Sequence, residues 1–214
     1  FCSSEIERIA GLIEKEGCKP KGLDRACFVD VAQRACPLHP TVLLALTYLF
    51  RKFGQNERSL FAYLIGQEPF GVSYLVDSRD DDFVRLYDLY DYFMANLAGG
   101  VTRHPGARHW FEVADALDRA NDLTHVEEKV LKVVGLLTVL GNVSPLKATR
   151  EIVSIALREK RASKEVCNAL EALRERSLLV YRRFSGTYRV WEGSDVDIET
   201  RIEEGRQKTA GRVP

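Results

Sequence analysis

Two short runs of β-prone residues near the end of the chain constrain its fold more than any other feature. The first covers residues 178–184 and the second covers residues 187–191, and only Ser185-Gly186 separates them. Branched and aromatic side chains on both sides of a two-residue turn that contains glycine are typical of a β-hairpin. We therefore predict two antiparallel strands that turn at Ser185-Gly186.

Three amphipathic segments precede the hairpin. Residues 127–140 carry apolar side chains at helical spacing. Ser144-Pro145 is a candidate N-cap followed by proline at the first helical position, so a second helix should run from there to about Leu157. A third helix should follow the candidate N-cap Ser163. Its expected buried face consists of Val166, Ala169, Leu170 and Leu173. Three helices and a hairpin in this order predict a winged helix-turn-helix over residues 126–192.

The first two thirds of the chain also show helical periodicity. Glycine and proline interrupt the apolar pattern, and no segment is suited to the strands of a parallel sheet. We expect a helix ended by Gly17, further helices over residues 23–35, 41–52, 57–65, 83–97 and 106–120, and an acidic surface loop over residues 77–82. The predicted fold is mainly α, with a helical bundle at residues 1–125, the winged helix at 126–192 and a charged tail or linker at 193–214.

Composition excludes several classes of protein. Lys+Arg and Asp+Glu both number 31, so the overall charge selects neither nucleic acid nor an acidic surface. The 5 cysteines contain no CxxC pair, which favours a reducing cytoplasm over a secreted disulfide framework. No apolar stretch approaches the ~20 residues of a membrane span. We expect a cytoplasmic protein with no membrane partner, and the start at Phe1 suggests a piece of a longer chain.

Sequence motifs for catalysis and for metal binding are missing. The G-x-x-x-x-G-K-[ST] phosphate loop, the G-x-S-x-G elbow and the HExxH pair do not occur in the chain. His104 and His109 are five residues apart, whereas two ligands on one helix need the spacing i, i+4. We therefore expect solvated histidines, no metal site and no catalytic residue within this chain.

Four segments resemble one protein family. They are LHPTVLL at residues 38–44, FGQNERSLF at 53–61, EPFG at 68–71 and YRRFSGTYRVWEGSD at 181–195. Most of residues 35–205 resemble the region after the nucleotide-binding core in large bacterial P-loop ATPases of the STAND/AAA+ kind, including the ATPases of BREX-type phage-exclusion systems. Residues 72–125 match only by pattern. The resemblance implies a lid-like helical domain and a winged helix joined to a missing N-terminal nucleotide-binding domain. ATP would be bound through that missing domain, because the Walker motifs are absent here.

The resemblance also implies three nucleotide-sensing residues. A lid helix in such enzymes offers an arginine to the terminal phosphate, and Arg58 occupies that place in the first turn of a predicted helix. Its planar guanidinium matches phosphate oxygens. The alternative for Arg58 is an ion pair on a solvated helix face. Asn56 and Glu57 also suit the capping of that helix. Pro40 could touch an adenine ring, but a simple helix start explains it better.

The predicted winged helix carries a local positive charge. Residues 145–191 contain eleven Lys or Arg and five Glu, a net charge of +6. Such an excess attracts phosphates without regard to base sequence. The candidate contacts are Lys164, Arg174, Arg182, Arg183 and Arg189. Arg182 and Arg183 are neighbours in the first predicted strand, so alternation should place them on opposite faces.

Two acidic residues argue against direct contact with DNA. Glu171 and Glu175 share the outward face of the third helix with Lys164 and Asn168, and their charges would repel the DNA backbone. We therefore favour an intramolecular or subunit-packing role for this unit. The hairpin aromatics are expected to pair across the strands and pack on the helices rather than to stack on bases. They are Tyr181, Phe184, Tyr188 and Trp191.

The function implied by the resemblance is that of the non-catalytic lid and winged-helix part of a P-loop ATPase, in phage defence or another process linked to nucleic acid. In that role Arg58 would sense the bound nucleotide, and the winged helix would relay its state to DNA or a protein partner. The alternative is a stand-alone winged-helix DNA-binding regulator whose helical bundle acts as a sensor. A homo-oligomer stays open.

Overall fold

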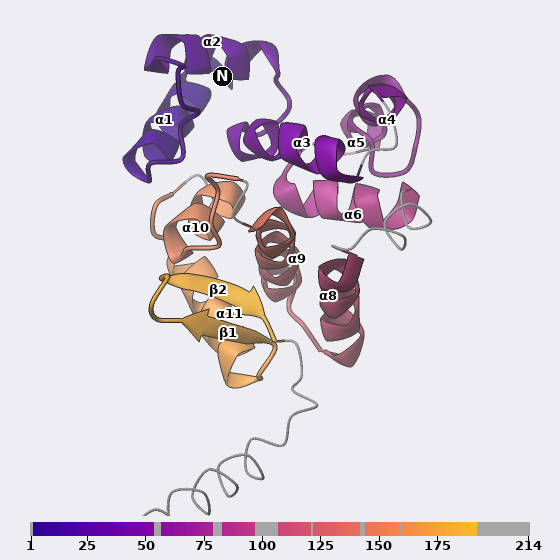
Figure 1. The fold of residues 1–214 in the computed structure, drawn as a ribbon, viewed down its shortest axis with the longest axis vertical. Coiled ribbons are helices and arrows are strands. Elements are labelled where there is room, and N and C mark those ends of the chain that lie inside the picture. The colour runs from indigo at the N-terminus through magenta and orange to yellow at the C-terminus, as the bar shows by residue number, and fades with distance from the viewer. Residues whose placement is uncertain are drawn as a thin grey trace, which may run out of the picture.

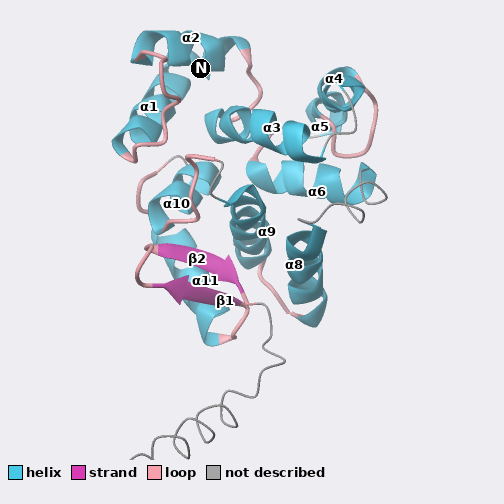
Figure 2. Cartoon of the chain, in the orientation of Figure 1, coloured by secondary structure: helices cyan, strands magenta, loops and turns pink. Residues whose placement is uncertain are grey.

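A computed structural model describes residues 2–53, 57–78, 83–96, 107–120, 122–141, 144–158 and 160–191. This part of the chain is mainly helical, as predicted, and carries a two-stranded antiparallel sheet (Figures 1 and 2). The helices are α1 (Cys2–Lys15), α2 (Arg25–Arg34), α3 (Pro40–Phe53), α4 (Glu57–Ile65), α5 (Val72–Ser78), α6 (Leu86–Asn96), α8 (Ala107–Arg119), α9 (His125–Leu140), α10 (Arg150–Arg158) and α11 (Lys164–Glu175). The strands are β1 (Leu179–Arg182) and β2 (Thr187–Val190). None of these helices is long and apolar enough to cross a membrane.

Short-range capping and turn signals define the N-terminal helices. Gly17 follows α1 in the left-handed conformation, with a φ of 69°. Asp24 caps α2, because its side chain accepts a hydrogen bond from the backbone N of Cys27. The second helix therefore begins two residues later than predicted. The sequence pattern missed α5, and Asp77, expected in a surface loop, lies within this helix.

Residues 83–85 are extended, although a helix was predicted to begin at Phe83. Val84 forms a parallel bridge with Leu38. The backbone N of Val84 donates to Pro37 O at 2.8 Å, and the N of His39 donates to Val84 O at 3.0 Å. These bonds engage the backbone of Val84 outside any helix, so α6 begins only at Leu86.

Helix α9 lies at the centre of the molecule and packs against α6, α8, α10, α11 and β2 (Figure 1). A capping box begins it, since Thr124 accepts from the N of Glu127 while the Glu127 carboxylate accepts from the N of Thr124. Its buried apolar side chains belong to a hydrophobic core that includes side chains from α1 through β2. The predicted boundary between residues 125 and 126 falls in the first turn of this shared helix.

The helix predicted to start at Ser144-Pro145 begins instead at Arg150. Ala148 accepts a backbone hydrogen bond of 2.8 Å from the N of Tyr188 in β2. The preceding segment therefore runs beside the hairpin and cannot be helical. Thr149 then provides the hydroxyl that accepts from the N of Ile152 at the start of α10. The third predicted helix is confirmed, with the side chain of Ser163 as its N-cap and the expected buried face.

The hairpin is antiparallel, as predicted, but its turn is longer than expected. Leu179 pairs with Val190 and Arg182 pairs with Thr187, so four residues rather than two connect the strands. The backbone N atoms of Ser185 and Gly186 both donate to Arg182 O, and Gly186 has a φ of 65°. The prediction that Arg183 belongs to the first strand was wrong, because the turn begins there.

Candidate functional site

A cavity of about 430 Å³ lies between α8, the end of α9, the segment before α10 and the hairpin. Its polar wall is formed by His109, Thr138, Lys147, Arg182 and Arg189. No Asp or Glu is among the described residues that line it. One lysine and two arginines therefore meet around one hollow with no acid among its described lining residues.

The geometry of the hairpin turns two of these cations toward the same face. Tyr188 and Val190 point into the core, with 3% and 2% of their surfaces exposed. Side chains alternate along a strand, so Arg189 lies on the opposite face of β2. Arg182 pairs with Thr187, and directly opposed residues share a face. Arg182 and Arg189 thus lie on the same face of the sheet, on neighbouring strands.

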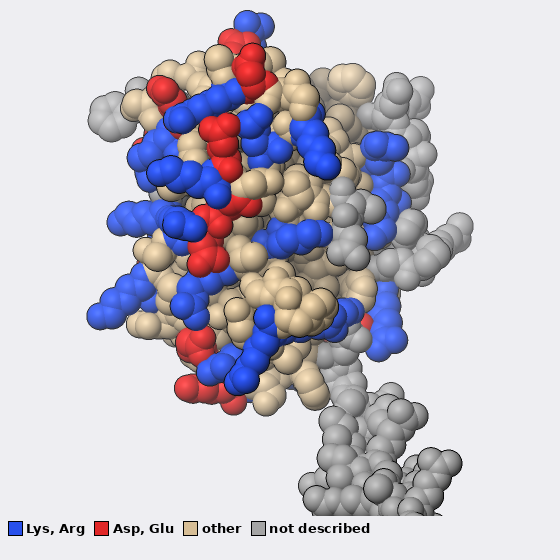
Figure 3. All heavy atoms as spheres, turned by 60° about the vertical axis from the view of Figure 1, so that its left-hand side comes forward, with Lys and Arg blue, Asp and Glu red and all other residues tan. Residues whose placement is uncertain are grey.

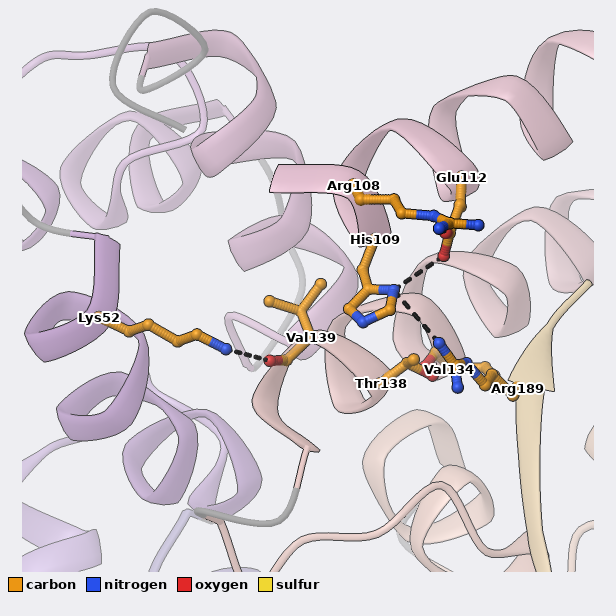
Figure 4. A network of polar contacts seen from close by, with 8 residues as sticks. All are labelled: Lys52, Arg108, His109, Glu112, Val134, Thr138, Val139 and Arg189. Carbon is orange, nitrogen blue, oxygen red and sulfur yellow. Dashed lines mark hydrogen bonds and ion pairs between the residues drawn. The ribbon is translucent and has the colours of Figure 1, made fainter. Parts of the chain in front are cut away.

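Lys147 is held beside them by the C-terminal end of α9. Its Nζ donates to Gly141 O at 2.8 Å. At the same end of α9, Lys52 Nζ donates to Val139 O at 3.1 Å (Figure 4). Ammonium groups suit this place, because the last carbonyls of a helix carry its negative dipole end. One hydrogen bond leaves two N–H groups of Lys147 able to face a ligand.

His109 connects α8 to the site and is not the solvated histidine expected from the sequence. Its side chain is 31% exposed, and its Nδ1 lies 2.8 Å from Glu112 Oε2 (Figure 4). A carboxylate only accepts, so Nδ1 carries the proton and donates to Glu112. Arg189 Nη2 lies 3.4 Å from the same nitrogen, which cannot accept while it donates. Arg108 Nε also donates to Glu112, at 2.7 Å.

The turn of the hairpin places an aromatic ring in solvent next to these cations. Phe184 lines the cavity and is 91% exposed. The prediction that Phe184 packs in the core was wrong, because the turn starts at Arg183 and leaves the ring nothing to pack against. Tyr188 is buried as predicted and faces the ring of Tyr181 at 5.0 Å across the strands. Tyr181 itself remains 40% exposed.

The three other predicted phosphate contacts are not among the residues that line the cavity. Arg183 lies in the turn of the hairpin, and Lys164 and Arg174 lie on α11. Lys164 is exposed in the first turn of α11, and Arg174 is exposed near its end. Glu171 lies 2.7 Å from Arg174 and 3.5 Å from Arg150, so its charge is balanced from two sides. Glu171 therefore repels an approaching phosphate less than the sequence alone suggested. Lys and Arg side chains predominate over acids on the face shown in Figure 3.

The nucleotide-sensing residues implied by the resemblance do not form a described site. Pro40 is the first residue of α3 and is buried within the chain. Asn56 lies outside the described residues, and the side chain of Arg58 is likewise not described, although its backbone belongs to α4. The sensing role of these three residues stays a prediction.

The described residues contain no group of three or more His, Cys, Asp or Glu side chains that could hold a metal ion. Comparison with protein-family models, with curated proteins and with solved structures finds no match for this chain.

Proposed function

We propose that residues 125–191 form a winged helix that binds the phosphate backbone of DNA in the cavity beside its hairpin. The order of elements supports the fold: helix α9, an extended segment, helices α10 and α11, and then the hairpin. The bond from Tyr188 N to Ala148 O attaches the extended segment to the free side of β2. An extended segment beside a two-stranded hairpin fits a winged helix, in which the hairpin forms the wing.

One observation carries the proposed function, namely the convergence of Lys147, Arg182 and Arg189 around a hollow with no acid among its described lining residues. Neutralising phosphates with such cations releases condensed counterions, which makes DNA binding strongly dependent on salt. Phe184 at the tip adds a ring on which an unpaired or splayed base can stack. These contacts read the backbone, so we expect little preference for base sequence.

Fluorescence anisotropy with a labelled 20-base-pair duplex at several salt concentrations tests this proposal. We expect Arg182→Ala to weaken binding and to reduce the slope of log K against log[salt] by about 0.9, as expected for one lost phosphate contact. Lys21→Ala removes the same charge from an exposed turn far along the chain and serves as the matched control. No binding by the unaltered chain, or equal losses in both variants, would exclude the cavity as a DNA site.

We propose in addition that helices α1–α8 act as the lid of a P-loop ATPase, as the resemblance implies, and that α9 transmits their movement to the winged helix. The observation that favours this role is the position of α9, which packs both on α6 and α8 and on α10, α11 and β2. Arg58→Ala in the complete ATPase should then reduce ATP turnover and leave the fold intact. Unchanged turnover would leave the alternative of a DNA-binding regulator.

A further inference from the structure

The turn of the hairpin holds the ring of Phe184 out in solvent at the edge of the molecule (Figure 2). The backbone N atoms of Ser185 and Gly186 donate to Arg182 O at 3.2 and 2.9 Å, and the hydroxyls of Ser185 and Thr187 lie 2.8 Å apart. These bonds fix the backbone on both sides of the ring. A ligand that covers Phe184 therefore has to order only a side chain with few torsions, which keeps the entropic cost of binding low.

The exposed ring lies beside positive charge. Phe184 lines the same hollow as Lys147, Arg182 and Arg189, and the exposed Arg183 directly precedes it in the turn. A flat aromatic face next to cations matches the chemistry of a nucleotide, in which one sugar joins a flat base to a phosphate. A strand whose phosphate contacts Arg182 therefore brings its base within reach of the ring two residues further along the hairpin.

The base that Phe184 covers has to be unpaired. Inside a duplex, neighbouring bases cover both faces of each base, so the ring can enter only if a base step opens. Opening one step costs about as much free energy as stacking on one ring returns. The bases of a single strand offer their faces without this cost. One exposed ring beside a cavity for phosphates therefore favours a strand that leaves the duplex.

We propose that the hairpin binds DNA at a junction between duplex and single strand. The cations of the cavity hold phosphates at the junction, and Phe184 stacks on the first unpaired base. This inference rests on the proposed function, because the cavity supplies the phosphate contacts. It adds the class of DNA, namely a duplex with an unpaired tail. Every base has a face for stacking, so the preference is for the structure of the DNA and not for its sequence.

Fluorescence anisotropy of the whole chain with labelled DNAs of three kinds tests this inference. The first is the blunt duplex of the previous experiment, the second carries a tail of about ten thymidines, and the third carries an equally long tail of abasic residues. The two tails have the same phosphates, so only the bases distinguish them. We expect the thymidine-tailed duplex to bind about tenfold more tightly than the abasic-tailed one.

Substitutions assign this difference to one ring. Phe184→Ala and Phe184→Leu should reduce the ratio of the two affinities from about tenfold to about one, whereas Phe184→Trp keeps an aromatic face and should retain the ratio. Because the ring is 91% exposed, the Tm of these variants should equal that of the unaltered chain. Phe111→Ala removes a ring that is 50% exposed on α8 and does not line the cavity, and it should retain the tenfold ratio.

The possible results separate this inference from the proposed function. Equal affinities for the two tails, or a ratio that persists in Phe184→Ala, overturn the inference, while binding of the blunt duplex still supports the proposed function. Loss of the ratio in Phe111→Ala to the same extent as in Phe184→Ala also overturns it. Absence of binding to all the DNAs overturns both.

Discussion

His39 is a titratable residue with no surface exposed to solvent. Its Nδ1 accepts from the N of Thr41 at 3.2 Å and lies 2.7 Å from Thr41 Oγ1, so the proton of the neutral ring resides on Nε2. The ring meets Phe83 edge to face at 5.4 Å. Burial lowers the pKa of His39 well below its ordinary value of 6.5, and the charge of Arg85 lowers it further.

This lowered pKa predicts that the chain loses stability in mild acid. Below about pH 6.5 His39 binds a proton in the unfolded chain but stays neutral in the folded chain. The free energy of unfolding therefore falls as the pH falls, by about 1.4 kcal/mol per pH unit. His39→Asn keeps an acceptor near the place of Nδ1 and does not titrate. Urea denaturation at pH 7 and pH 5 should show a loss about 2 kcal/mol larger for the unaltered chain than for the variant. Equal losses would contradict the assignment.

Replacement by alanine is expected to have opposite effects on stability at two helical glycines. A Cβ on Gly135 in α9 would lie 2.3 Å from Val113 Cγ2, inside the contact between α9 and α8. Gly135→Ala should therefore lower the free energy of unfolding by about 1–3 kcal/mol through overpacking. A Cβ on Gly11 in α1 would meet only the movable end of Arg25, at 3.0 Å. Gly11→Ala should raise stability by up to about 1 kcal/mol in the same urea titration.

At the scale of elements, local signals predicted most helices and failed where a distant segment decides the backbone. The third helix of the C-terminal part was predicted correctly, because Ser163 and the spacing of its apolar residues are local features. The extended segments at 83–85 and 146–149 were predicted as helix. Each segment pairs with backbone far along the chain: Val84 pairs with Pro37 and His39, and Ala148 pairs with Tyr188. A local sequence pattern cannot predict such pairing.

The capping box of α9 makes a prediction about this central helix. The N and the hydroxyl of Thr124 donate to Glu127 Oε2 at 2.7 and 2.8 Å, and the Glu127 side chain is largely buried. Thr124→Ala should lower the free energy of unfolding by about 1–2 kcal/mol, because it removes both the cap and a partner of a buried carboxylate. Thr124→Ser keeps the hydroxyl and should retain most of the stability. Chemical denaturation of the two variants distinguishes these outcomes.

At the scale of the whole molecule, one hydrophobic core joins the predicted helical bundle to the hairpin unit through α9. We therefore expect a single cooperative unfolding transition for the described part of the chain. Trp191→Phe leaves Trp110, buried on α8, as the only tryptophan. The fluorescence of Trp110 and the far-UV circular dichroism of the variant should follow the same urea denaturation curve. Two separated transitions would show that the bundle and the hairpin unit fold independently.

In the candidate site too, local sequence patterns predicted some residues, and the fold alone brings in the others. Arg182 and Arg189 were predicted as phosphate contacts, because a hairpin pattern fixes their strands and their charge is evident. Lys147 and His109 were not predicted, since the cavity brings together α8, the end of α9 and the hairpin from widely separated positions. Only the fold makes His109, Lys147 and Arg189 neighbours.

The bridge between Leu38 and Val84 also bears on how quickly the chain folds. The segment between these two residues contains α3, α4 and α5. Their pairing closes a loop of about 45 residues, and the entropic cost of this closure precedes the formation of any hydrogen bond of the bridge. Helices with local contacts form before such a closure. The transition state for folding should therefore be reached while residues 37–39 and 83–85 are still apart, so that substitutions at the bridge mainly accelerate unfolding and leave the folding rate nearly unchanged.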